Sequence, residues 1–132
     1  ELFNGMTTEM VTACGRHPLI TVGSHSVSHP LLSALDVENL DKELTNSRTL
    51  LEEISGQRLD FLAYPSGDYN QFVIQAARRA GYRYGFAVKS LGLGEPMYEI
   101  PRVGIYHADA YYLDLKLCGI LDRPIRKLSS NQ

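Results

Sequence analysis

The stretch that decides how this chain folds is residues 21–30, TVGSHSVSHP. The apolar run at residues 19–22 leads into it and ends at Gly23, which predicts a short buried strand followed by a turn. His25 and His29 then follow four residues apart. If the segment after the strand turns helically, both imidazoles fall on one face and can reach a single metal ion. Such a pair is more often incidental than a metal site, so the rest of the chain must decide.

The serines of this stretch have a predicted structural role. Ser26 and Ser28 carry short hydroxyl side chains that hydrogen-bond nearby backbone groups. They are therefore expected to hold a turn next to the end of a sheet.

Helices and strands are predicted to alternate along the rest of the chain. Capping residues and helical spacing predict four helices. They run from Thr7 or Thr8 to about residue 13, with Gly15 after it, from the cap Asp36 to Gly56, over 71–80 with Asn70 as its cap, and over about 110–121 with Asp109 as its cap. Strands are predicted at 59–64, at 82–88 and within 98–106. The charged residues of the long helix, Glu43 among them, are interpreted as its solvated face. This order favours an α/β fold with parallel strands.

Sites in parallel sheets lie at the carboxyl ends of the strands. The histidine segment follows one predicted strand, and the loop over residues 64–70 follows the next. We therefore expect these two segments to lie at the same edge of the sheet.

Composition limits the possible classes of function. The 132 residues suffice for one domain, and the last part, 122–132, is predicted to fray. A formal net charge of −2 and the lack of a basic stripe give no reason to expect nucleic acid as a partner. No apolar run approaches the roughly 18 residues that span a bilayer. The chain begins at Glu1 without Met, which is expected for a mature or truncated form and leaves the compartment open.

Four motifs in order resemble one known family. They are GSHSVSHPLL at 23–32, the helix with Glu43, Leu44 and Ser47, FLAYPSG at 61–67, and AGY at 80–82 followed by IPRV at 100–103. Together they resemble the polysaccharide deacetylases with a NodB-homology domain, carbohydrate esterase family four. The resemblance runs over about residues 7–120. It implies that the chain, 1–132, is a single α/β domain, a partial distorted (β/α) barrel.

The resemblance also implies a chemistry. The family hydrolyses N-acetyl, sometimes O-acetyl, groups of polysaccharides with a divalent metal, usually zinc, held by an aspartate and two histidines. His25 and His29 match the two histidines. In such a reaction the metal polarises the acetyl carbonyl, and a carboxylate takes a proton from water.

Two departures from the family pattern affect this expectation. The family's Asp-Asp motif, which supplies the base and the third ligand, has no counterpart here, because no Asp precedes His25. We expect that the N-terminal βα units are missing and that the chain corresponds to the C-terminal two-thirds of the family domain. In addition, Ala63 stands where many members have an arginine. Arg102 is hypothesised to supply that cation.

The resemblance assigns further roles to single residues. Ser66 is expected to offer its backbone N–H to the oxyanion, beside Tyr64, Pro65 and Gly67 on the substrate side. A tight turn after a strand explains the same proline and glycine. His107 is a candidate acid for the leaving group. Asp68 and Asp109 are better explained by turn and capping chemistry.

Alternative functions remain open at this point. The chain is expected to act on an acetylated polysaccharide in the cell envelope or outside the cell. A catalytically inactive fragment that binds glycan, or an assembly module, is the alternative. An exposed sheet edge favours a homo-oligomer.

Overall fold

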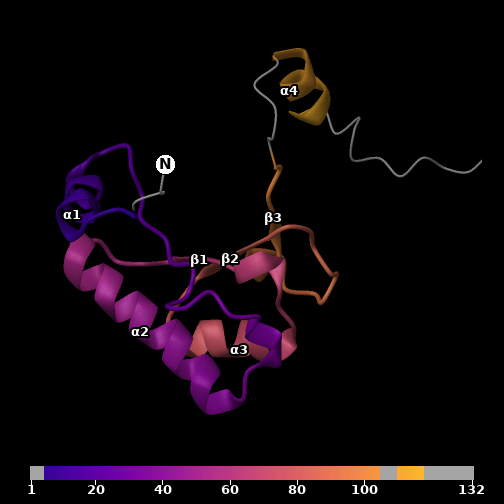
Figure 1. Ribbon diagram of the computed structural model, residues 1–132. Coiled ribbons are helices and arrows are strands. Elements are labelled where there is room, and N and C mark those ends of the chain that lie inside the picture. Colours follow the sequence, from indigo (N-terminus) through magenta and orange to yellow (C-terminus); the bar gives the residue numbers. More distant parts are fainter. Residues whose placement is uncertain (1–4, 105–109, 118–132) are drawn as a thin grey trace, which may run out of the picture. The chain divides into compact units, whose positions relative to one another are not determined.

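A three-stranded parallel sheet lies at the centre of the chain (Figure 1). The computed structural model describes residues 5–104 and 110–117. The strands are β1 (Phe61–Ala63), β2 (Tyr84–Ala87) and β3 (Ile100–Pro101), in the order β1-β2-β3. Both pairings are parallel, which confirms the predicted α/β class. Each strand is shorter than the sequence predicted.

The helices are α1 (Thr8–Arg16), α2 (Val37–Ser55), α3 (Gln71–Arg79) and α4 (Ala110–Leu117), with the short 3₁₀ turns η1 (Leu32–Ala34), η2 (Pro65–Gly67) and η3 (Pro96–Tyr98). The predicted caps are confirmed for the first three helices, because the side chains of Thr7, Asp36 and Asn70 each accept a hydrogen bond from a backbone N–H of the first turn. Gly56 ends α2 in the left-handed conformation, as expected. Asp109, the predicted cap of α4, lies outside the described residues.

The sequence predicted that α1 ends before Gly15, and this prediction is wrong. The helix continues through it to Arg16. A Cβ atom at Gly15 would collide with the carbonyl group of Ser55, at the end of α2. Gly15 therefore lies within the helix, where it allows a close approach between two helices.

The predicted strand at residues 19–22 is wrong. Leu19 is 88% exposed, and pairing is limited to one isolated parallel bridge between Ser24 and Leu62. The Gln57 side chain accepts a hydrogen bond from Val22 N and donates one to the carbonyl oxygen of Ile20. A side chain from just after α2 thus takes the place of a neighbouring strand.

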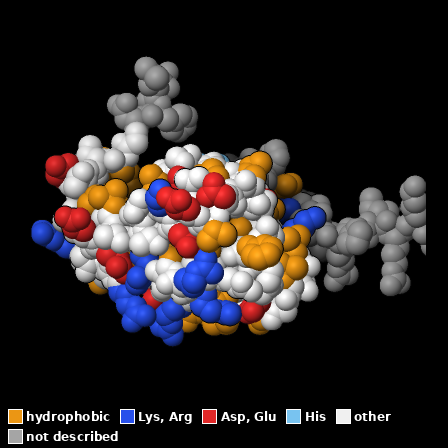
Figure 2. Space-filling view, turned by 90° about the horizontal axis from the view of Figure 1, so that it is seen from below, with side chains coloured by type: hydrophobic (Ala, Val, Ile, Leu, Met, Phe, Trp, Pro, Cys, Tyr) orange, Lys and Arg blue, Asp and Glu red, His pale blue; other side chains and the backbone are white. Residues whose placement is uncertain are grey.

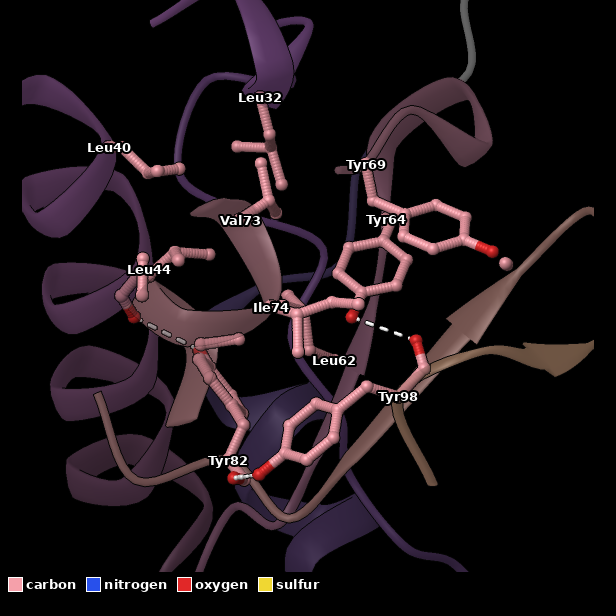
Figure 3. Packing of buried hydrophobic residues seen from close by; sticks show 13 residues of the cluster. Leu32, Leu40, Leu44, Leu62, Tyr64, Tyr69, Val73, Ile74, Tyr82 and Tyr98 are labelled. Carbon is pink, nitrogen blue, oxygen red and sulfur yellow. Dashed lines mark hydrogen bonds between the residues drawn. The ribbon is translucent and has the colours of Figure 1, made fainter. Parts of the chain in front are cut away.

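Helices α2 and α3 pack side by side on one face of the sheet (Figure 1). The buried cluster between them includes Leu44 of α2, Leu62 of β1 and Ile74 of α3. Buried tyrosines satisfy their hydroxyls within this core: Tyr64 Oη donates to the Tyr98 carbonyl, and Tyr98 Oη donates to the Tyr82 carbonyl (Figure 3). These bonds tie β1 and β2 to the segment before β3.

The face that carries α2 and α3 shows acidic, basic and hydrophobic side chains together (Figure 2). Exposed ion pairs include Lys42 with Glu38 at 2.6 Å and Arg79 with Asp41 at 2.8 Å. Within the ranges described, no helix has both the length and the apolar character needed to cross a bilayer.

Contacts divide the chain into two units, Glu1–Arg102 and Val103–Gln132. The first contains the sheet, α1, α2 and α3, and the second contains α4. A single domain over 1–132 stays a prediction, and the tail 122–132 lies outside the described residues.

Candidate functional site

The histidine segment is fixed to the sheet through Ser24. Its backbone N–H donates to the Phe61 carbonyl at 2.9 Å, and its carbonyl accepts from Ala63 N at 2.8 Å. Ser24 therefore extends the sheet beyond β1 by one residue. His25 leaves the sheet at the carboxyl end of β1, the edge at which the sequence predicts a site.

His25 and His29 lie together, with 4.8 Å between their ring centroids and 77° between their planes. The segment between them is not helical. Ser26 and His29 have positive φ angles of 64° and 59°, so a turn, rather than a helix, brings the rings together. Left-handed backbone at residues other than glycine costs about 1 kcal/mol or more each, so surrounding contacts must hold this turn.

Side-chain oxygens supply those contacts. Ser26 N donates to Ser24 Oγ at 3.2 Å, and His29 N donates to Ser26 Oγ at 3.1 Å. The predicted turn-holding role is confirmed for Ser26. Ser28 Oγ instead donates to a carboxylate oxygen of Glu43 at 2.6 Å.

Glu43 was assigned by sequence to the solvated face of its helix, and that assignment is wrong. Its carboxylate accepts hydrogen bonds from the backbone N–H groups of Val27 and Ser28, at 2.8 and 3.0 Å. Burial raises its pKa, but these bonds and the Ser28 hydroxyl outweigh burial, and the net pKa is below its usual range. The sequence spacing gave no sign of this contact, because it joins residues 15 and 16 positions apart.

The imidazole of His25 is oriented by the sheet. Its Nδ1 atom lies 2.7 Å from the carbonyl oxygen of Ala63 in β1. A carbonyl can only accept, so Nδ1 carries the proton and Nε2 keeps its lone pair. Histidines that bind a metal through one ring nitrogen usually donate a hydrogen bond from the other, as Nδ1 of His25 does here. The two imidazoles can therefore serve as two ligands of one divalent cation. Among the described residues, no group of three His, Cys, Asp or Glu side chains could hold a metal ion.

The loop after β1 forms the second part of the site. It contains η2, in which Ser66 has a φ of 55°. Gly67 has a φ of 67°, and a Cβ there would lie 2.6 Å from a methyl group of Val88. This loop therefore needs glycine for its conformation and for its contact with the end of β2.

Asp68 joins this loop to η1, the turn that follows the histidine segment. One carboxylate oxygen accepts from Ser33 N at 2.7 Å and the other from Ser33 Oγ at 2.8 Å. Both oxygens are thus engaged in structural bonds, in agreement with the turn chemistry expected for this residue.

The predicted substrate-side residues do not all face solvent. The Tyr64 and Pro65 side chains are buried, whereas Ser66 is exposed. Burial is also the main reason that the pKa of the Tyr64 hydroxyl is raised. The Tyr64 hydroxyl is engaged in the core, where it donates to the Tyr98 carbonyl, and a substrate-side role for Tyr64 stays a prediction.

Arg102 lies at the end of β3, where its N and Nε atoms donate to the Ala87 carbonyl at 3.0 and 3.4 Å. It is exposed and has no ion pair among the described side chains. Strands β1 and β2 lie between β3 and the bridge that Ser24 forms with Leu62. The structure therefore brings the two histidines together but leaves Arg102 at the far side of the same edge. His107 lies outside the described residues.

A cavity of about 440 Å³ adjoins the histidine segment. His25 and Ala63 form part of its wall, together with the rings of Phe61 and Phe86, whose centroids are 5.9 Å apart. This cavity is open to one face of the sheet and is mostly apolar.

Comparison with known proteins agrees with this arrangement. Residues 3–85 match the family described as polysaccharide deacetylase. YxkH of Bacillus subtilis (strain 168) is 26% identical over 102 residues, which cover 76% of this chain and 36% of YxkH. Peptidoglycan-N-acetylmuramic acid deacetylase PdaC of the same organism is 41% identical over 49 residues, 37% of this chain and 10% of PdaC. The chain thus spans about a third or less of the length of these relatives.

Solved structures show the same fold. The deacetylase PplD of Streptococcus pyogenes, in complex with acetate, has a TM-score of 0.70 at 23% identity and covers 78% of this chain and 46% of its own. The polysaccharide deacetylase BC0361 of Bacillus cereus has a TM-score of 0.71 at 21% identity and covers 83% of this chain and 35% of its own. The structural similarity and the open parallel sheet of this chain together confirm the prediction of a partial barrel of the polysaccharide deacetylase type. The family match covers more than half of the chain, which therefore belongs to the polysaccharide deacetylase family.

Proposed function

We propose that this chain forms part of the active site of a metal-dependent enzyme that removes acetyl groups from a polysaccharide. The observation that carries the proposal is the pair formed by His25, whose Nε2 is left free, and His29, with 4.8 Å between their ring centroids. This pair lies at the carboxyl edge of a parallel sheet, the usual place for a site in such folds.

His25 and His29 would hold a divalent cation, and zinc suits two imidazole ligands well. A bound divalent ion would polarise the acetyl carbonyl and lower the pKa of adjacent water. The residues of this chain that surround the pair fix the orientation of the rings, through the Ala63 carbonyl and the serine contacts.

Ser66 is proposed to stabilise the oxyanion through its backbone N–H. Among the hydrogen bonds of the described residues, none has the Ser66 amide as its donor. Buried Tyr64 and Pro65 and the close-packed Gly67 keep this turn rigid, which a preorganised oxyanion donor requires. The proposed substrate-side role of Tyr64, Pro65 and Gly67 is to fix the position of the Ser66 backbone.

Arg102 is proposed to supply the cation hypothesised for the site, although it follows β3 at the far side of the same edge, and His107 is proposed to be the acid for the leaving group. Acetate release by the protein that contains this chain tests both. Arg102→Ala and His107→Ala are each expected to lower the rate. Unchanged rates would overturn the role of the residue concerned.

The substrate is proposed to be an acetylated glycan of the cell envelope, acted on there or outside the cell. The name of PdaC, a peptidoglycan deacetylase, supports this class of substrate, since that relative is 41% identical over the segment it shares with this chain.

Zinc binding by the chain is the experiment that tests the proposal. Calorimetry is expected to show zinc binding by the unmodified chain and none by the His25→Ala/His29→Ala double variant. His17→Ala is the matched control, because this histidine is exposed and its imidazole accepts a hydrogen bond from Leu19 N in the turn after α1, away from His25 and His29. Equal zinc binding by the double variant would contradict the assignment of the two ligands.

A second candidate is a module that binds glycan without hydrolysing it. It is favoured by the finding that the described side chains offer no third metal-binding group next to the histidines. Binding to an acetylated glycan without acetate release would support this candidate. Assembly into a homo-oligomer stays a prediction, and sedimentation of the chain would test it.

A further inference from the structure

We propose that Glu43 is a positioning residue that holds the turn between His25 and His29 in the shape needed to bind a metal ion. This inference rests on the proposed function, because it assigns a role to Glu43 in the same site. In the sequence, Glu43 belongs to one of the motifs that resemble the family and stands among other charges of α2, such as Glu38, but its position does not indicate a contact with the histidine turn.

The first argument is the number of bonds. One carboxylate oxygen of Glu43 accepts from Val27 N at 2.8 Å and from Ser28 N at 3.0 Å, and the other accepts from Ser28 Oγ at 2.6 Å. Hydrogen bonds to an ionised acceptor are stronger than neutral ones. Glu43 thus holds the two residues at the middle of the turn with three such bonds.

The second argument is the backbone conformation on either side. Ser26 and His29, which flank Val27 and Ser28, both have left-handed backbone angles. Residues other than glycine keep that conformation only where their surroundings enforce it. The remaining amides of the turn are bonded to serine hydroxyls within the turn itself, so Glu43 is the contact that fastens the turn to a helix.

The third argument is that α2 holds the segment at two points, one helical turn apart. Ser47 lies four residues after Glu43, and its hydroxyl accepts from Ser24 Oγ at 2.9 Å. Ser47 is buried and fixes the start of the segment at the sheet, while Glu43 fixes the turn. Both oxygens of Glu43 are engaged, so it serves the histidines through their backbone and is not itself offered as a ligand.

The test compares Glu43→Ala and Glu43→Gln with Glu38→Gln. Glu38 is a matched control because it lies on the same helix and its carboxylate pairs with the exposed Lys42 side chain, away from the histidine turn. Two properties are measured: the nuclear Overhauser contact between the two imidazole rings in the metal-free chain, and the affinity of the chain for zinc. Thermal unfolding of the metal-free variants reports on the fold as a whole.

Glu43→Ala is expected to lose the ring contact and to bind zinc about 10–100-fold more weakly, the usual effect of removing a group that orients a ligand. Glu43→Gln keeps one acceptor oxygen, and its zinc affinity and ring contact are expected to decrease less than those of Glu43→Ala. Glu38→Gln is expected to match the unmodified chain in both measurements. A ring contact and zinc affinity that persist in Glu43→Ala would overturn the inference, as would losses that merely follow the global melting temperature.

Two further results separate this inference from the proposed function. If the unmodified chain binds no zinc, the proposed metal site fails, but the ring contact still decides whether Glu43 positions the histidines. If Glu43→Ala does not fold, Ser28→Ala decides instead, because it removes one of the three bonds without changing α2. It is expected to weaken the ring contact, and an unchanged contact would count against the inference.

Discussion

The Nδ1 atom of His25 lies 2.7 Å from the carbonyl oxygen of Ala63, in the strand beside it. The two residues are 38 positions apart in the chain, so only the fold creates this pair. It decides which nitrogen of the ring faces the open side of the site.

The first prediction follows from this bond. Neutral His25 is expected to carry its proton on Nδ1, because the carbonyl can only accept. Nitrogen chemical shifts of the imidazole in the metal-free chain would identify the tautomer. His17, whose Nδ1 instead accepts from Leu19 N, is expected to show the opposite tautomer and serves as an internal control. A proton found on Nε2 of His25 would contradict the proposed orientation.

The second prediction concerns the packing behind the loop that carries Ser66. Gly85→Ala is expected to destabilise the fold by about 2 kcal/mol or more, because its Cβ would collide with the Tyr64 hydroxyl and lie 2.7 Å from the Tyr98 carbonyl. Gly5→Ala, which has no neighbour within 4 Å, is the control. Chemical denaturation measures both. Equal stability of the two variants would show that the contact between β2 and Tyr64 is looser than described.

The third prediction concerns pH and the buried carboxylate of Glu99. Burial raises its pKa, but bonds from the N–H groups of Glu95, Leu93 and Leu91 and from the Tyr69 hydroxyl outweigh burial and lower the pKa from 4.5 to about 2. The unfolded chain therefore takes up the proton first as the pH falls. The carboxylate stabilises the fold above about pH 4.5, and this contribution is lost as the pH falls towards 2.

Glu99→Gln is accordingly expected to lower the melting temperature at neutral pH and to differ less from the unmodified chain near pH 3. Thermal unfolding at both pH values measures this. Glu38→Gln, at an exposed surface pair, is expected to have little effect at either pH. A difference for Glu99→Gln that stays the same at both pH values would contradict the role of the charge.

The fourth prediction concerns the link between the two segments of the site. Asp68→Ala removes both bonds to Ser33 and is expected to destabilise the chain by about 1 kcal/mol, because water replaces part of what is lost at this exposed position. Asp41→Ala breaks the exposed pair with Arg79 and is expected to cost less. Denaturant titration of both variants makes the comparison. A larger loss of stability for Asp41→Ala than for Asp68→Ala would contradict the role of Asp68 in joining the loop after β1 to Ser33.

Much of the local structure could be predicted because it depends on neighbours in sequence. Asp36 and Asn70 cap the helices that follow them, and Gly56 ends α2, because each acts on the backbone within one turn of itself. The order of these elements was also enough to predict parallel strands and a site at their carboxyl edge. The spacing of four residues singled out the two histidines on the assumption of a helix, whereas a turn with left-handed backbone at Ser26 and His29 brings their rings together.

What sequence could not predict depends on groups brought together from distant positions. Residues 19–22 are apolar and look like a strand, but Gln57 meets their backbone where a strand would have to pair. Gly15 looks like a helix end, but it is needed where α1 meets Ser55.

For the site itself, the sequence by itself determined which residue types stand at the carboxyl edge, because motif and element order are local properties of the chain. The tertiary structure alone decided how they are held. The carbonyl of Ala63 sets the ring of His25, and the carboxylate of Glu43 meets the turn from a helix that follows it. A pattern of spacing carries no record of such contacts, since they form only when the sheet and α2 have packed together.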